Sequence, residues 1–128
     1  MRKAILPYAL VALVAGCGDG GSTAPTESFF EVRNFRVEPA TSTGTQPIRF
    51  LFELRINPAQ LVFTNLTVDG EVLLATSSTQ ACPDWCDTLV FTTTAESFPN
   101  LGSHRAVLVV VDAETNTTVE LVAMFTVN

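Results

Sequence analysis

The sequence predicts an all-β protein whose folded part, residues 28–128, is a seven-stranded antiparallel β-sandwich. Three observations lead to this prediction. Apolar and polar side chains alternate over several runs, as they do in strands that are buried on one side. Turn-forming residues separate these runs at the spacing typical of a sandwich. No window keeps the period of a helix over several turns.

The first two expected strands, 29–37 and 48–56, show the alternation most clearly. In the second, every even-numbered residue from Ile48 to Ile56 is apolar, which predicts one buried face. The first strand changes phase at Arg33-Asn34. We therefore expect a β-bulge there, which would turn the apolar residues on both sides of it inward.

Five further strands are separated by equally clear turn signals. Asp69-Gly70 is a two-residue hairpin signal, because both residues tolerate positive φ. The run that starts at His104 is nearly all apolar, as expected of a central strand. The five strands are expected at 62–68, 71–75, 88–94, 104–112 and 119–127.

The charge distribution argues against nucleic acid as a partner. All thirteen acidic residues lie after residue 17, where only five arginines offset them, leaving a net charge of about −8. Such a field repels a polyanion.

The N-terminus has the features of an export signal followed by a tether. Arg2 and Lys3 precede an apolar run of about a dozen residues, which is shorter than the roughly 20 residues that span a bilayer. Residues 18–27 are small, polar and rich in glycine, as in a flexible linker.

The segment Val14-Ala15-Gly16-Cys17 resembles the lipobox of bacterial lipoproteins. The resemblance implies a signal peptide at 1–16, a lipidated Cys17 that begins the mature chain, and a linker that ends at residue 27. Gly18 follows the cysteine, so the resemblance favours the outer membrane of the cell envelope, with Asp19 leaving the inner membrane as an alternative. An ordinary secretory signal with an incidental cysteine is the other alternative.

The segment 101–107, Leu-Gly-Ser-His-Arg-Ala-Val, is similar to the start of the sixth strand in bacterial Ig-like and fibronectin-III-like domains. His104 stands where such domains often have tyrosine. We expect a non-enzymatic role in binding or scaffolding, without a cofactor, because no nucleophile, base or metal set can be identified in the sequence. The resemblance implies an Ig-like sandwich over 28–128. It is a likeness of fold and does not identify the ligand.

Cys82 and Cys86 are expected to form a disulfide. Export places them in an oxidising compartment, and a helix-like turn would bring residues four apart within bonding reach. Closing so short a loop stabilises a fold by roughly 2 kcal/mol. A redox-active pair and a metal site that adds Asp84 and Asp87 remain alternatives, although no histidine lies nearby to complete a zinc set.

The sequence offers little for catalysis. His104 is the only histidine, and no Gly-x-Ser-x-Gly turn supplies a nucleophile, so we expect a structural histidine and no enzyme activity. Asp69, Asp112 and Glu114 stand beside turns, where carboxylates bond the backbone. Calcium at these strand ends is a minor alternative, and no metal is expected.

The strand 104–112 is apolar on both faces, and a sandwich buries only one. The outward face would then be an apolar patch that binds a protein partner or a second copy of the chain, unless neighbouring segments cover it. The residues of this candidate binding face are Val107, Val109, Val111, Val122 and Met124.

A second candidate binding region is the loop with Asp84, Trp85 and Asp87. An exposed Trp85 would suit a glycan, another envelope ligand or the lipid interface. The alternative is that Trp85 packs over the disulfide. We expect this loop at the same end of the domain as the turns near 57–60 and 113–117.

Overall fold

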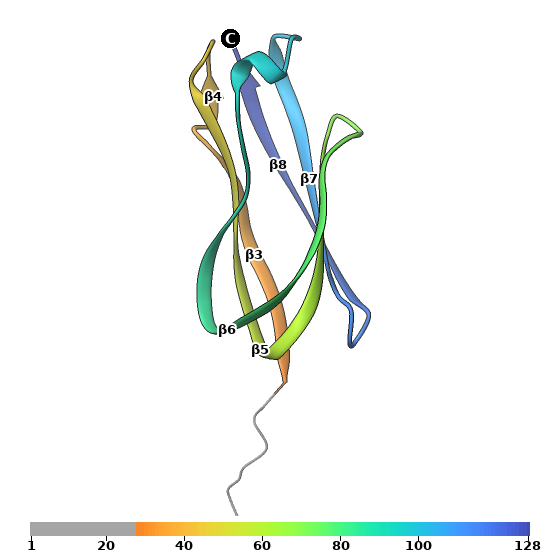
Figure 1. The fold of residues 1–128 in the computed structure, drawn as a ribbon. Helices are drawn as coiled ribbons and strands as arrows, with labels where there is room; N and C mark the ends of the chain where they lie inside the picture. Colours follow the sequence, from red (N-terminus) through yellow and green to blue (C-terminus); the bar gives the residue numbers. More distant parts are fainter. Residues whose placement is uncertain (1–27) are drawn as a thin grey trace, which may run out of the picture.

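The computed structural model describes residues 28–128, which are almost entirely β-strand (Figure 1). The expected signal peptide, the lipidated Cys17 and the tether lie outside the described residues. Residues 28–128 contain one short 3-10 helix and no helix that is long and apolar enough to cross a membrane. The elements are β3 (Phe29–Glu38), β4 (Thr41–Ser42), β5 (Pro47–Val68), β6 (Glu71–Thr94), η1 (Ala95–Ser97), β7 (Gly102–Asp112) and β8 (Thr117–Val127).

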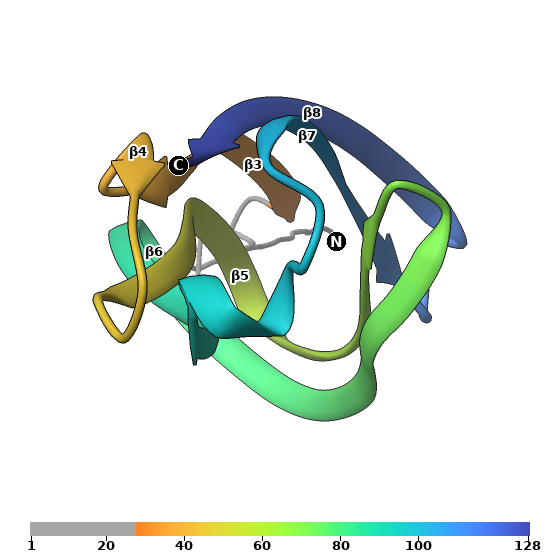
Figure 2. The ribbon, with the colours of Figure 1, turned by 90° about the horizontal axis from the view of Figure 1, so that it is seen from above.

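The strands form one six-stranded mixed sheet that curls nearly closed around a single core (Figure 2). β5 and β6 bend together and so belong to both sides of it. Residues 47–56 of β5 lie between β3 and residues 82–94 of β6, and we call these three segments the first layer. Residues 60–68 of β5 lie between β7 and residues 71–80 of β6. These segments, with β8 and β4, form the second layer.

The all-β prediction is confirmed, but the predicted strand boundaries are wrong in two places. The runs 48–56 and 62–68 belong to one strand, and so do 71–75 and 88–94. The reason is that the intervening residues keep their backbone pairing: Gln60 lies opposite Gln80, and Ile56 lies opposite Cys82. The expected turn near 57–60 is a bend, marked by a register shift between Ile56 and Gln60.

The expectation of purely antiparallel pairing is also wrong. β4 lies parallel to β8, with Thr41 opposite Thr126. The Thr126 N–H donates to the Ala40 carbonyl at 2.8 Å, and the Asn128 N–H donates to the Ser42 carbonyl at 2.9 Å. A strand of two residues is too short to carry a hydrophobic period, so no pattern in the sequence could predict it.

The core contains the apolar residues that the alternating pattern predicted to be buried. The even-numbered residues from Ile48 to Ile56 are at most 2% exposed. The β3 register shifts between Arg33 and Arg36, which confirms the predicted bulge, and Asn34 has a φ of 56°. The bulge turns the apolar pairs on both sides of it toward the core.

The turn between β5 and β6 confirms the predicted hairpin. Asp69 and Gly70 have φ values of 52° and 86°, as a two-residue turn of this kind requires. This turn lies at the far end of the domain from the point where the described chain begins (Figure 1).

Candidate interaction surface

The outward face of the second layer carries all five residues of the predicted binding face. Val122 and Met124 on β8 are 45% and 56% exposed, and the three predicted valines of β7 are half-buried. The alternate residues of β7, Ala106, Leu108 and Val110, are fully buried in the core. β7 therefore presents apolar side chains to both sides of the sheet.

Strand register places several of these residues side by side, with Asn65 and Glu120 on either side of Val109. Val107 lies opposite Val122, and Val111 lies opposite Phe63 of β5. Directly opposed side chains in a sheet have Cβ atoms about 5 Å apart, so they contact one another. Three exposed residues of this face were not predicted from the sequence, although alternation with the buried Val62 was a signal for the first two: Leu61, Phe63 and Val72. We call the whole set the valine face: Leu61, Phe63, Val72, Val107, Val109, Val111, Val122 and Met124.

Two opposite charges also lie on this surface. Arg105 stands opposite Met124, and Glu120 stands opposite Val109. Within residues 28–128, neither side chain forms an ion pair. Both are exposed, so a partner that covered the face would have to pair with them, because a buried unpaired charge is costly.

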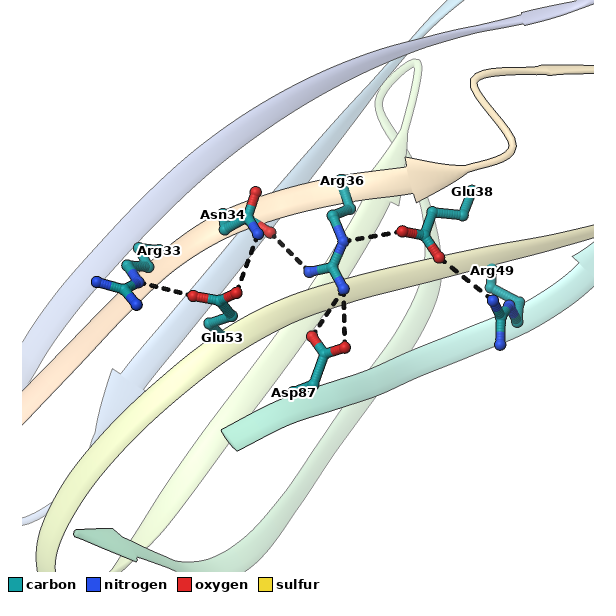
Figure 3. Close-up of polar contacts among 7 residues, drawn as sticks. All are labelled: Arg33, Asn34, Arg36, Glu38, Arg49, Glu53 and Asp87. Carbon is teal, nitrogen blue, oxygen red and sulfur yellow. Dashed lines mark hydrogen bonds and ion pairs between the residues drawn. The ribbon is translucent and has the colours of Figure 1, made fainter. Parts of the chain in front are cut away.

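The outward face of the first layer carries a network of ion pairs instead (Figure 3). Arg36 of β3 is its centre: one guanidinium nitrogen donates to both carboxylate oxygens of Asp87, at 2.7 and 2.9 Å. The Nε atom of Arg36 donates to Glu38 at 3.1 Å. The hydrogen bonds to Asp87 are the main reason why the pKa of Arg36 is raised.

The other arginines of the first layer are paired in the same way. Arg33 donates to Glu53 at 2.7 Å, and this bond is the main cause of a lowered pKa for Glu53. Arg49 reaches Glu38 at 3.2 Å. Arg55 pairs with Glu31 at 2.8 Å. Leu51, on the outward side of β5, is only 7% exposed in this layer. Leu89 of β6, opposite Leu51, is 53% exposed, while each of these arginines within residues 28–128 has a carboxylate partner.

The predicted ligand loop forms part of this network. It is a bulge in β6 and not a helix-like turn: Leu54 pairs with Cys86 and Ile56 pairs with Cys82, so the three residues between the cysteines project outward. A Cys82–Cys86 disulfide closes the bulge, with a Cα–Cα distance of 6.1 Å. The bulge thus has the predicted covalent closure but a different backbone form.

The candidate ligand residues of this bulge are largely engaged by β3. The Arg33 guanidinium lies 3.6 Å from the centre of the half-buried Trp85 ring, a cation–π contact. Asp87 is bound by Arg36, and Asp84 is exposed. Only one face of the Trp85 ring is left for a ligand, because Arg33 covers the other.

The three segments expected at one end of the domain do lie together. Strand register places Phe29 opposite Asn57, Ile56 opposite Cys82 and Val62 opposite Asp112. This is the end at which the described chain begins (Figure 1).

His104 occupies a structural position at the opposite end. It is 5% exposed and stacks on Phe125, with ring centres 5.3 Å apart. Its Nδ1 atom lies 2.6 Å from the Asp69 carboxylate, and its Nε2 atom lies 2.7 Å from the Asn100 carbonyl oxygen. Both ring nitrogens are therefore engaged, and neither is placed to accept a proton from a nucleophile.

The turn carboxylates bond as expected for Asp69 and Asp112. Asp69 accepts the Arg105 N–H at 2.9 Å, the main cause of its lowered pKa, and His104 lowers it further. The fully buried Asp112 accepts the Glu114 N–H at 3.0 Å and the Thr115 hydroxyl at 2.9 Å. In the described part of the chain, no three His, Cys, Asp or Glu residues are grouped so as to hold a metal ion.

Comparisons with known proteins identify the fold and no family. No family model and no curated protein matches the sequence. The chain is similar to an alkylpurine DNA glycosylase of Pseudomonas fluorescens solved bound to DNA with an abasic site analog. The TM-score is 0.56 at 13% identity, over 82% of this chain and 32% of that chain, so the chain spans about a third of the glycosylase.

A second similar structure is the CARDB domain of a Pyrococcus furiosus protein, solved in complex with di-metal ions. Here the TM-score is 0.50 at 18% identity, over 80% of this chain and 96% of that domain. Identities this low concern the fold alone.

Proposed function

We propose that this chain is a lipid-anchored, non-enzymatic protein of the bacterial cell envelope, whose Ig-like domain binds a protein partner through the valine face. The observation that carries the proposal is the valine face itself. Single exposed apolar residues are common on protein surfaces, but a continuous apolar area of several hundred Å² typically marks an interaction site.

The charge of the domain supports the choice of this face. A strongly acidic domain is kept apart from other acidic surfaces by repulsion. The valine face holds one cation and one anion, Arg105 and Glu120, so it adds no net charge to a contact. A partner could bind there without meeting the acidic field of the rest of the domain.

The Ig-like assignment is supported by the bends in β5 and β6. If each is divided at its bend, the domain has the seven strands expected from the sequence, with β4 as a short addition. A sandwich of this kind provides outward sheet faces for binding.

The anchoring is supported by the lipobox that ends at Cys17. Several acyl chains hold a protein durably on a membrane. A ten-residue flexible linker has a root-mean-square reach of roughly 17 Å, so the domain would stay close to the lipid surface, in the proposed location at the outer membrane. Partners would then be other envelope proteins or a second copy of the chain.

The test is a photo-crosslinking residue placed at Val109 in the full-length chain in its own envelope, with the same residue at the exposed Thr92 as the control. We expect a discrete protein adduct at position 109, absent at 92 and lost when Met124→Asp is added. Equal adducts at both positions, or none at 109, would refute the proposal. Thermal unfolding of purified Met124→Asp protein should match the parent, because Met124 contributes little to the core.

A further inference from the structure

β6 is an edge strand along its whole length. Within the described residues its 24 residues, Glu71–Thr94, pair with β5 and with no other strand. The opposite side of β6 therefore presents a row of backbone N–H and C=O groups without strand partners. Such a row can form hydrogen bonds with the backbone of another extended strand.

This edge carries little of the usual protection against pairing over residues 72–81. Proteins commonly guard edge strands with lysine, proline, inward-pointing charges or a bulge. Residues 72–81, Val-Leu-Leu-Ala-Thr-Ser-Ser-Thr-Gln-Ala, contain no charge and no proline. One bulge lies near the start of the segment, at Leu73, and the next protection is Pro83, inside the bulge closed by the disulfide.

A groove lies beside this edge, between the two layers. Its floor is apolar and includes Phe52, Leu54 and Val62, and its volume is about 120 Å³. That far exceeds the roughly 10–15 Å³ needed by one water molecule. Along β6, the side chains that line the groove are Leu74 and then the short or polar Thr76, Ser78 and Gln80. These three do not fill the space beside the apolar floor.

We infer that the edge 72–81 of β6 accepts an extended strand from a partner protein, whose alternate apolar side chains enter the groove. Side chains of an added strand alternate between the two faces of the sheet, so every second one would point between the layers. The inference rests on the proposed function for the existence of protein partners, and it adds a second binding site that is distinct from the valine face.

A foreign strand fits this site better than a second copy of β6. Two copies paired edge to edge around a two-fold axis would place Thr76, Ser78 and Gln80 of one copy beside the groove of the other. These side chains cannot match an apolar floor. An incoming strand with valine or leucine at alternate positions can place apolar side chains against this floor. The edge carries no charge and does not repel such a strand.

The test uses the peptide Lys-Val-Thr-Val-Thr-Val-Thr-Val-Lys, capped at both ends, and the full-length chain purified in detergent. Hydrogen exchange read by mass spectrometry should show slowed exchange of the amides in 72–81 when the peptide is added. The same peptide with alternate backbone nitrogens methylated should bind at least tenfold more weakly, since it cannot form the ladder. Equal binding of the two peptides, or no protection of 72–81, would overturn the inference.

Two matched lysine substitutions locate the site. Ser78→Lys places a charge on the exposed rim of the groove, and Ser103→Lys places the same charge on the exposed start of β7. We expect Ser78→Lys to weaken peptide binding at least tenfold and Ser103→Lys to leave it unchanged. Equal effects of both would contradict a site at this edge.

Two further outcomes separate this inference from the proposed function. Met124→Asp, on the valine face, should leave peptide binding unchanged even where it abolishes the adduct at position 109. If the free protein is instead a dimer whose 72–81 amides are already protected, a second copy occupies the edge and the donated strand is excluded.

Discussion

The two outward faces of this domain share the long strands β5 and β6, yet one is dominated by paired charges and the other by apolar side chains. On the first layer, residues 47–56 of β5 carry arginines and a glutamate that pair with β3, and Arg36 of β3 pairs with Asp87 of β6 (Figure 3). On the second layer, residues 60–68 of β5 carry Leu61 and Phe63 beside the valines of β7. The first face satisfies its own charges and covers Leu51. The second leaves its apolar groups exposed, and only a partner would remove them from water.

The largest expected effect is the difference in the free energy of unfolding lost when a buried or a partly exposed apolar side chain is truncated. Leu51→Ala on the first layer should cost about 2–4 kcal/mol in the free energy of unfolding, because Leu51 is buried. Val109→Ala on the valine face should cost less than about 1 kcal/mol, because its side chain is only partly buried. Urea unfolding of the two variants measures both values. Equal losses would mean that the two faces are equally buried.

The disulfide should contribute the next largest effect. Replacing Cys82 and Cys86 together by serine removes a closed loop of five residues, which the chain-entropy model values at about 2 kcal/mol. Intact mass before and after reduction establishes the bond, and thermal unfolding of the variant gives its contribution. Two free thiols in protein isolated from the envelope would disprove the bond.

Acid should weaken the first layer more than the valine face. The pKa of Glu53 is lowered, mainly by the bond from Arg33, so its stabilising contribution is complete above its usual value of 4.5 and is lost as the pH falls below it. Glu53→Gln should therefore flatten the fall of the melting temperature between pH 5 and about pH 3. Glu120→Gln on the valine face is the control, and its profile should follow the parent. Parallel profiles for Glu53→Gln and the parent would contradict the pairing.

The sequence predicted those features of the fold that depend on residues close together in the chain. The two-residue period of β7 predicted both its buried side chains and its half-buried outward valines, and Asp69-Gly70 predicted its turn from the φ values that those residues accept. The bulge at Arg33-Asn34 followed from a change of phase. Each of these depends on residues within one strand or one turn.

What the sequence could not predict depends on register between distant segments. Arg36 and Asp87 are separated by 51 positions, and nothing local indicates that they meet. The continuity of β6 through 76–80 was hidden because an exposed edge needs no apolar pattern. The open edge and its groove are properties of strand order, so they emerged only with the topology.

The central claim is that the valine face is covered in the cell. The most direct test is maleimide labelling of Val122→Cys in intact envelopes and in purified full-length protein, with Thr92→Cys on the first layer as the reference. We predict that Val122→Cys reacts freely when purified and at least tenfold more slowly in the envelope, while Thr92→Cys reacts equally in both. Equal reactivity of Val122→Cys in the two preparations would contradict it.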